Sequence, residues 1–294
     1  MSTSAKTIIA TGASSGLGFE VIKQLLEQSE QAYNFILGVR STEKVQAAYN
    51  DLGYDTTKHS ITILPLDLLS LRSVQLFTQQ ALAKLGPHRI DYLFLNAGML
   101  DKAEGPGPHG SQWCEGYVVN HLAQHYFVHL LRETLTASQT RLVFVSSGAI
   151  RNVRGQDPAT LDVDLKANSG AGIGPVYSAS KFVGLLGAHY WRRNLPQCIV
   201  VAVSPGLIPS TGLATSLGLS MSMPDAKTIP EGAQNLLRAF TVKDFPADPE
   251  QVFLTSWGDW WSKEVIALSL DKTLQDKWCL SREEIEKQEV LSNE

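Results

Sequence analysis

The sequence contains little cysteine and no long apolar run, and each shortage excludes a class of protein. Its three cysteines, Cys114, Cys198 and Cys279, are odd in number and widely spaced. This spacing fits neither a disulfide framework nor a zinc site, so we expect reduced thiols in a cytoplasmic protein. No stretch approaches the ~18 apolar residues of a membrane-spanning helix, and no signal-peptide pattern follows Met1. We therefore expect no membrane span.

A surplus of charge of one sign is also missing. The 25 lysines and arginines nearly balance the 29 aspartates and glutamates, which gives a formal net charge of -4. This balance offers no electrostatic reason to expect nucleic acid or an acidic membrane surface as a partner. The chain has 294 residues, of which 44% are hydrophobic, and lacks repeats and low-complexity linkers. It can bury one full core, so we expect a single domain over residues 1–294.

Strand-like and helix-like segments alternate along the chain. Short apolar or β-branched runs predict seven strands separated by helical patterns, at residues 6–10, 34–39, 60–64, 90–95, 141–145, 199–203 and 251–255. The alternation predicts an α/β fold, a doubly wound parallel sheet of the Rossmann type with helices on both faces. Residues 262–294 are expected to form a charged helical extension at the surface, where Ser281 and Glu284 make a capping box.

A glycine-rich turn, Thr-Gly-Ala-Ser-Ser-Gly-Leu-Gly at residues 11–18, joins the first predicted strand to the first predicted helix. Its glycines would let backbone amides approach a pyrophosphate at the positive end of the helix dipole. The spacing of these glycines differs from the G-x-G-x-x-G fingerprint of dinucleotide sites. A plain glycine turn without a ligand is therefore the alternative interpretation. The strand before and the helix after favour a nucleotide site, which would consist of Gly12, Ser14, Ser15, Gly16, Leu17 and Gly18.

Tyr177 and Lys181 are four residues apart, so on a helix they share one face. A free tyrosine has a pKa of ~10, too high for acid–base catalysis at neutral pH, and a nearby ammonium favours the phenolate. Alone, this pair is more often a solvated lysine near a half-buried tyrosine. Ser146 and Ser147 after the fifth predicted strand, together with the glycine turn, favour a catalytic site.

These motifs occur in the order found in the short-chain dehydrogenase/reductase family, which the chain resembles over roughly residues 5–260. The shared motifs are the glycine turn, Asn96-Ala97-Gly98, Asn120, Ser147, Tyr177-x-x-x-Lys181 and Pro205-Gly206. Residues 118–122 and 205–213 look most like the branch that contains retinol dehydrogenases and protochlorophyllide reductase. The resemblance implies hydride transfer with a nicotinamide cofactor.

The resemblance also implies a role for each catalytic residue. Ser147 would orient and polarise a substrate carbonyl, and Tyr177 would transfer the proton. Lys181 would lower the pKa of Tyr177 and hold the nicotinamide ribose, while Asn120 would hold a water that links the lysine to solvent. Ser146 is the competing serine, but the second serine of the pair usually faces the substrate in this family.

The choice of cofactor depends on the end of the second predicted strand. An acidic residue there binds the ribose of NAD, whereas an arginine accommodates the 2′-phosphate of NADP. Arg40 and Ser41 occupy this place, so the sequence predicts NADP(H), with a solvated arginine as the alternative. By resemblance, Tyr177, Lys181 and the other motifs complete the cofactor site, which includes Asp67, Leu68, Asn96, Ala97, Gly98, Pro205, Gly206, Ile208 and Thr211.

Three histidines, His121, His125 and His129, repeat every four residues as a metal-binding stripe on a helix would. No acidic ligand accompanies them and the expected chemistry needs no metal, so we expect no metal site. The chain departs from the branch pattern at Gln124, where a histidine is usual.

Two long segments, residues 151–174 and 210–228, are expected to line the substrate pocket. The second is apolar and adaptable, since it carries Leu213, Leu217, Leu219, Met221 and Met223. The leading interpretation is an NADP-dependent reductase of lipophilic ketones or aldehydes, or a dehydrogenase of the alcohols. A reductase of carbon–carbon double bonds and a non-catalytic NADP-binding sensor or scaffold are the alternatives. The sequence does not decide whether two copies of the chain form a homodimer.

Overall fold

The computed structural model describes residues 4–28, 30–153, 157–215 and 217–289. Its centre is a seven-stranded sheet in the order β3-β2-β1-β4-β5-β6-β7, and every ladder between neighbouring strands is parallel. The strands are β1 (Lys6–Thr11), β2 (Tyr33–Val39), β3 (Ser60–Pro65), β4 (Tyr92–Leu95), β5 (Arg141–Val145), β6 (Ile199–Val203) and β7 (Phe253–Leu254). The predicted doubly wound α/β fold is confirmed.

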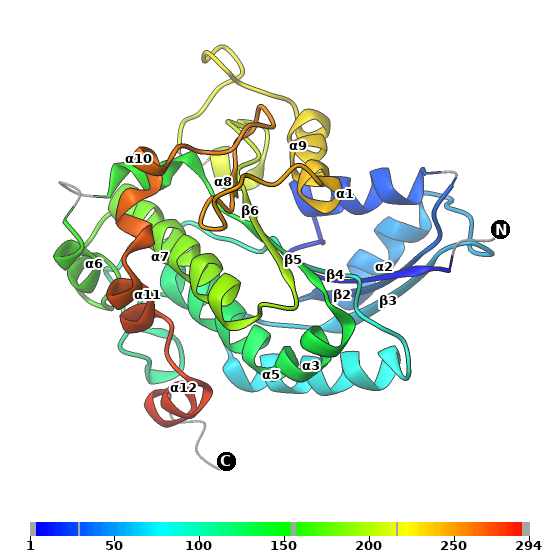
Figure 1. The fold of residues 1–294 in the computed structure, drawn as a ribbon, viewed down its shortest axis with the longest axis horizontal. Coiled ribbons are helices and arrows are strands. Elements are labelled where there is room, and N and C mark those ends of the chain that lie inside the picture. Colours follow the sequence, from blue (N-terminus) through cyan, green and yellow to red (C-terminus); the bar gives the residue numbers. More distant parts are fainter. Residues whose placement is uncertain (1–3, 29, 154–156, 216, 290–294) are drawn as a thin grey trace.

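Helices cover both faces of this sheet (Figure 1). One face packs against α1 (Gly16–Leu26), α2 (Thr42–Asn50) and α9 (Ile229–Thr241). The other packs against α3 (Leu71–Leu85), α5 (Ala123–Ser138) and α7 (Ile173–Asn194). Successive strand residues alternate between the two cores, as Ile8 and Ile9 do, because side chains of a strand point to opposite faces. This double burial explains why the strands are almost wholly apolar.

The order of the strands fixes where a ligand can bind. From β1 the chain moves outward through β2 to β3, and then returns to place β4 on the other side of β1. The connections therefore leave in opposite directions at the carboxyl ends of β1 and β4, which opens a crevice there. The glycine turn follows β1 and Asn96-Ala97-Gly98 follows β4, so both motifs lie at this crevice.

Short helices and turns connect the larger elements. They are η1 (Pro108–Gly110), α4 (Glu115–Tyr117), the π-helical turn η2 (Val118–Leu122), η3 (Gly148–Asn152), α6 (Ala159–Asp164) and α8 (Gly212–Thr215). The last strand is shorter than predicted, because the backbone turns back after Leu254: Thr255 N donates to Asp259 O at 2.7 Å. None of the described helices combines the length and the apolarity needed to cross a lipid bilayer.

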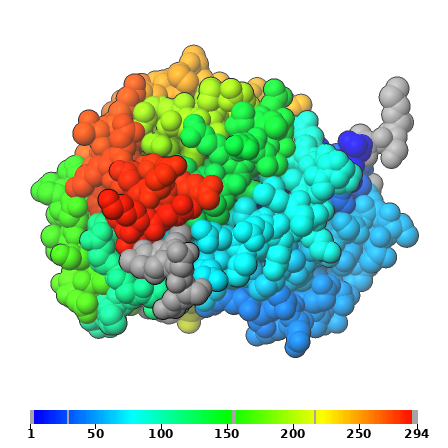
Figure 2. Space-filling model, turned by 90° about the horizontal axis from the view of Figure 1, so that it is seen from below, coloured from blue at the N-terminus to red at the C-terminus, as the bar shows by residue number. Residues whose placement is uncertain are grey.

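The C-terminal segment contains α10 (Lys263–Ile266), η5 (Ala267–Leu270), α11 (Lys272–Trp278) and α12 (Arg282–Gln288). The predicted capping box of Ser281 and Glu284 is present at the start of α12. The segment is more than a surface helix, however, because Trp278, Cys279 and Ile285 are buried. It packs against α7 and α5, and Figure 2 shows it as the red region on that side of the molecule.

Candidate active site

The glycine turn is held close to the end of β4. Gly12 has a φ of +68°, and a Cβ there would lie 2.6 Å from Ala97 Cα. A Cβ on Gly18 would lie 2.2 Å from Gly12 O, so neither position has room for a side chain. A Cβ on Gly16 would make only an ordinary contact with Thr211, but its φ of +55° favours glycine. The turn thus presents bare backbone at the start of α1, where the first N–H groups lack helical partners and can bind an anion.

A hydrogen-bond network fixes this turn to its neighbours. Thr11 Oγ1 accepts from the backbone N–H groups of Asn96 and Ala97 at 3.2 Å each, and donates to Gln124 Oε1 at 3.3 Å. Gln124 Nε2 donates to Ala97 O at 3.0 Å, and Asn96 Nδ2 to Gly12 O at 2.9 Å. The family motifs alone do not predict that Thr11 and Gln124 hold the end of β4 against the glycine turn. The only hint in the sequence is that Gln124 stands where the branch usually has a histidine.

The residues proposed to select the cofactor lie at the ends of β2 and β3. Arg40 is exposed directly after β2, and Ser41 is the N-cap residue of α2 without a side-chain capping bond. Asp67 Oδ1 accepts from Leu69 N at 3.0 Å, which fixes this carboxylate in the loop after β3. Leu68 beside it is buried. Both strand ends border the crevice where the glycine turn lies, and Tyr49 OH of α2 donates to Ala13 O at 2.7 Å.

Ser147, Tyr177 and Lys181 come together where β5 ends and α7 begins. The Ser147 hydroxyl hydrogen-bonds the Tyr177 side chain and accepts from Ala149 N at 3.1 Å. Lys181 Nζ lies 5.9 Å from the centre of the Tyr177 ring and donates to Val145 O at 3.1 Å. A Cβ on Gly98 would approach Lys181 Nζ to 3.1 Å, so glycine leaves room for the lysine.

The protonation of this pair is governed by burial. Burial raises the pKa of Tyr177, and the hydrogen bond with Ser147 acts in the opposite direction. Burial also lowers the pKa of Lys181 to about 8.

Asn120 lies beside Lys181, and its side-chain amide is bonded to backbone and to Ser180. Its Oδ1 accepts from Met99 N at 2.8 Å, while its Nδ2 donates to Met99 O at 3.0 Å and to Ser180 Oγ at 2.9 Å. The amide therefore clamps the loop after β4 onto α7. With these bonds in place, its nitrogen has no hydrogen left to donate to a water.

The segment after β6 closes the other side of the crevice. Gly206 has a φ of +96°, and Asn235 Nδ2 of α9 donates to Pro205 O at 2.8 Å. The Thr211 methyl group lies 3.9 Å from the Cβ position of Gly16, so it borders the glycine turn. Ile208 is buried against Gly232 of α9, where it packs in the protein interior.

The predicted substrate segments are only partly described, because residues 154–156 and 216 lie outside the described ranges. Lys227 N donates to Leu207 O at 2.8 Å and so joins the two ends of the segment 210–228. Between these ends Leu217, Met221 and Met223 are exposed by 36%, 49% and 37%. Large apolar side chains thus face solvent next to the crevice.

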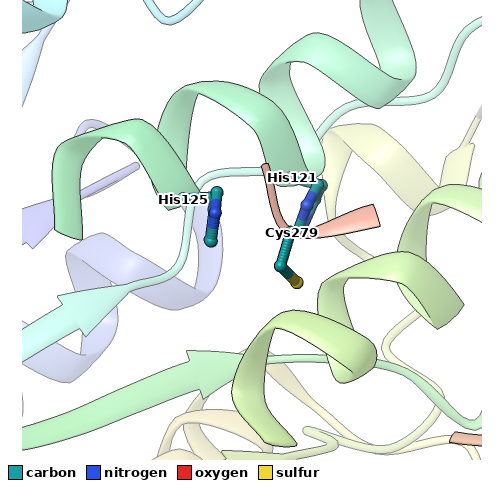
Figure 3. A group of neighbouring side chains, drawn as sticks. All are labelled: His121, His125 and Cys279. Atoms are coloured by element: carbon teal, nitrogen blue, oxygen red, sulfur yellow. The ribbon is translucent and has the colours of Figure 1, made fainter. Parts of the chain in front are cut away.

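His121 and His125 of the histidine stripe are buried, and Cys279 of the C-terminal segment lies beside them (Figure 3). The candidate ligand atoms of His121, His125 and Cys279 lie within 4.8 Å of one another. The two imidazoles stack, however, with centres 5.3 Å apart and planes 17° from parallel. Nε2 of His121 lies 3.0 Å from Trp278 O, and Nε2 of His125 lies 2.9 Å from Leu280 O, so both nitrogens face backbone carbonyls.

A parallel sheet of this order, a glycine turn at its crevice and an adjoining Ser–Tyr–Lys group define the class of dinucleotide-dependent α/β oxidoreductases. A family model described as short chain dehydrogenase matches residues 6–158. The chain is 57% identical to a short-chain dehydrogenase/reductase of Pestalotiopsis microspora over 288 residues, which cover 97% of this chain and 99% of that protein.

More distant relatives place the chain within that class. It is 28% identical to human retinol dehydrogenase 12 over 239 residues, which cover 79% of this chain and 72% of that protein. An NADPH-bound carbonyl reductase from chicken fatty liver, 18% identical, shares the fold with a TM-score of 0.66 over 88% of this chain and 94% of that chain. The chain belongs to the short-chain dehydrogenase/reductase family, in its retinol dehydrogenase-like branch.

Proposed function

We propose that the protein is an NADP(H)-dependent oxidoreductase that reduces a lipophilic ketone or aldehyde, or oxidises the corresponding alcohol. The observation that carries this proposal is the grouping of Ser147, Tyr177 and Lys181 beside the glycine turn. A proton donor at this edge of the sheet lies where a dinucleotide would place its reactive end. The exposed apolar residues of 210–228 support a lipophilic substrate.

The residues of the crevice fit a nicotinamide dinucleotide. The bare backbone of the glycine turn would meet the pyrophosphate, and Arg40 with Ser41 would bind a 2′-phosphate. The pocket at Gly98 leaves Lys181 room to reach the nicotinamide ribose. When bound, the cofactor supplies the hydride, while the protein supplies orientation and the proton.

Proton transfer is assigned to Tyr177. In reduction, the Ser147 hydroxyl would hold the substrate oxygen while Tyr177 O–H donates its proton to that oxygen as negative charge develops there. Tyr177 is protonated before the reaction because burial raises its pKa. The Lys181 ammonium would stabilise the phenolate that remains. In oxidation the same phenolate would accept the alcohol proton.

The names of similar proteins agree with this chemistry. Human retinol dehydrogenase 12 is named for an alcohol, and the chicken protein is described as a carbonyl reductase with NADPH bound. Both names favour transfer at a carbon–oxygen bond over reduction of a carbon–carbon double bond.

The direct test is a screen for NADPH consumption over lipophilic ketones, aldehydes and enones, with identification of each product. Tyr177→Phe removes the acid and keeps the ring, so turnover of a ketone should fall by about 100-fold or more while NADPH still binds. Tyr126→Phe is a suitable control, because Tyr126 is buried between Gln75 and Glu286, away from the crevice. A product reduced only at a carbon–carbon bond, or full turnover by Tyr177→Phe, would contradict the proposal.

A further inference from the structure

Arg151 places a positive charge one helical turn beyond the catalytic Ser147. It belongs to η3, which starts at Gly148 just after the end of β5. Its Nε donates to Gly148 O at 3.0 Å, and a Cβ on Gly148 would lie 3.3 Å from its Nη2. The guanidinium therefore lies against the residue next to Ser147. Standard backbone dimensions put it within roughly 10 Å of the Ser147 Cα.

A tryptophan supports this guanidinium from a distant part of the chain. Arg151 Cζ lies 5.1 Å from the centre of the Trp261 ring, within the range of a cation–π contact. Trp261 is itself fixed beside β7, because its N–H donates to Phe253 O at 2.9 Å and its ring centre lies 5.7 Å from that of Phe253. These contacts hold the charge beside Ser147, although Arg151 is exposed.

Most of the hydrogen-bonding capacity of Arg151 is unused. A guanidinium carries five N–H groups in one plane, and Gly148 O accepts the one on Nε, which leaves four. Within the described ranges, no carboxylate pairs with Arg151 and no second acceptor meets it. A fixed cation with free donors in one plane is suited to bind a carboxylate through two parallel hydrogen bonds.

We propose that Arg151 is a specificity-determining residue that binds a carboxylate of the substrate, so that the substrate is a lipophilic carbonyl compound with an acidic group. This inference rests on the proposed function and names its substrate class more closely. The apolar residues of 210–228 would cover the body of the molecule. Arg151 would fix the opposite end, so that the carbonyl meets Ser147 and Tyr177 in one orientation.

Lys227 is another cation beside the crevice, and its contacts differ. Its Nζ donates to Ser256 O at 3.0 Å and lies 5.4 Å from the centre of the Trp257 ring. A Cβ on Gly206 would lie 3.5 Å from Lys227 Cδ, so this lysine adjoins the segment after β6. An ammonium lacks the planar pair of donors that matches a carboxylate, which is why the acidic group is assigned to Arg151.

The test compares an acid with its own methyl ester. The probes are meta-acetylbenzoate, para-acetylbenzoate and their methyl esters, which keep the ketone and the ring but remove the negative charge. At saturating NADPH, the parent protein should show a kcat/KM for at least one acid that is about tenfold or more above that for its ester. Arg151→Gln should lower this ratio to about one, mainly through a higher KM for the acid. Arg151→Lys keeps the charge without the planar donors and should retain part of the preference.

Arg132→Gln is the matched control. Arg132 is an exposed arginine in the second half of α5, which leads to the amino edge of the sheet, so the variant loses the same charge far from Ser147. Its acid-to-ester ratio should equal that of the parent. The melting temperature of Arg151→Gln separates recognition from support: if Arg151 only joined η3 to Trp261, its loss would lower the melting temperature and slow acid and ester equally.

Equal kcat/KM values for acids and esters in the parent would overturn the inference, and so would a parent-like ratio in Arg151→Gln. A preference that disappears in Lys227→Gln and persists in Arg151→Gln would overturn it as well.

Calorimetry with the acids and the NADP⁺-loaded protein provides a readout that needs no turnover. If no ketone is reduced but an acid binds the parent and not Arg151→Gln, the proposed function fails and the carboxylate site stands. If the esters are reduced and neither acid binds, the carboxylate site fails and the proposed function stands.

Discussion

The glycine turn and the segment 210–228 border the same crevice but are held in place by different means. The turn is fixed by backbone that lies as close as 2.2 Å to a glycine Cβ position, and by the side chains of Thr11, Asn96 and Gln124. The segment 210–228 is joined at its two ends by a backbone hydrogen bond, and its large apolar side chains face solvent. The glycine turn is thus held by close backbone packing, whereas the middle of the segment 210–228 carries exposed apolar side chains.

This contrast explains why the family could be identified from sequence and the substrate could not. A close backbone approach requires glycine, and that requirement shows directly in the sequence. An apolar loop can be built from many side chains, and its exposure depends on how it folds. Mutations on the two sides should therefore differ in what they change and by how much.

The largest effect is expected for Gly18→Ala on the cofactor side. The added Cβ would lie 2.2 Å from the backbone oxygen of Gly12, which no side-chain movement can relieve. We expect a loss of about 2–4 kcal/mol in the free energy of unfolding and little NADPH binding. Calorimetry and titration with NADPH measure both quantities. Gly105→Ala, with no atom within 4 Å of the new Cβ, is the control; an equally stable Gly18→Ala would show that the turn is not held as described.

Much of this cofactor side was predictable from local sequence. The strand, the glycines and the following helix are contiguous, and Asn96-Ala97-Gly98 ends a strand whose place in a parallel sheet follows from alternation. The role of Gln124 was not predictable, because it joins the ends of two strands that are distant in the chain. The packing of Ile208 against α9 was not predictable either, because only the fold brings that helix near.

The C-terminal segment shows the same limit. The capping box of Ser281 and Glu284 is local and was predicted correctly. The position of Trp278 and Cys279 against His121 and His125 depends on where the chain returns after β7, which no sequence pattern specifies. From the sequence we expected no metal site at the histidine stripe but could not name its partners, which the structure shows to be the backbone carbonyls of Trp278 and Leu280.

The second largest effect is expected for Arg40→Asp. If Arg40 binds the 2′-phosphate, the parent protein should bind NADPH at least about tenfold more tightly than NADH, which corresponds to ~1.4 kcal/mol. The aspartate would repel the phosphate and accept a ribose hydroxyl, so the variant should prefer NADH. Dissociation constants for both cofactors in both proteins measure this reversal. Equal affinities of the parent protein for NADPH and NADH would mean that Arg40 does not bind the 2′-phosphate.

The third effect is a pH dependence set by the buried catalytic pair. Burial lowers the pKa of Lys181 to about 8, so its ammonium is present below that pH and is lost above it. Ketone reduction should therefore fall above pH 8, by about tenfold at pH 9, while NADPH binding through Arg40 changes little. Initial rates at saturating NADPH test this fall. A rate that stays constant to pH 10 would mean that the lysine charge does not assist Tyr177.

The smallest effect is expected on the substrate side, for Met221→Asn combined with Met223→Asn. These side chains are 49% and 37% exposed, so the free protein should lose little stability when they become polar. If the segment 210–228 closes over a lipophilic substrate, each lost apolar contact should weaken binding by about 1 kcal/mol, which raises KM roughly 30-fold for the pair. The NADPH dissociation constant and the melting temperature should stay at the parent values, in contrast to Gly18→Ala. An unchanged KM would mean that the segment packs elsewhere and that residues 151–174 form the pocket, because the exposed methionines would then have no ligand to cover.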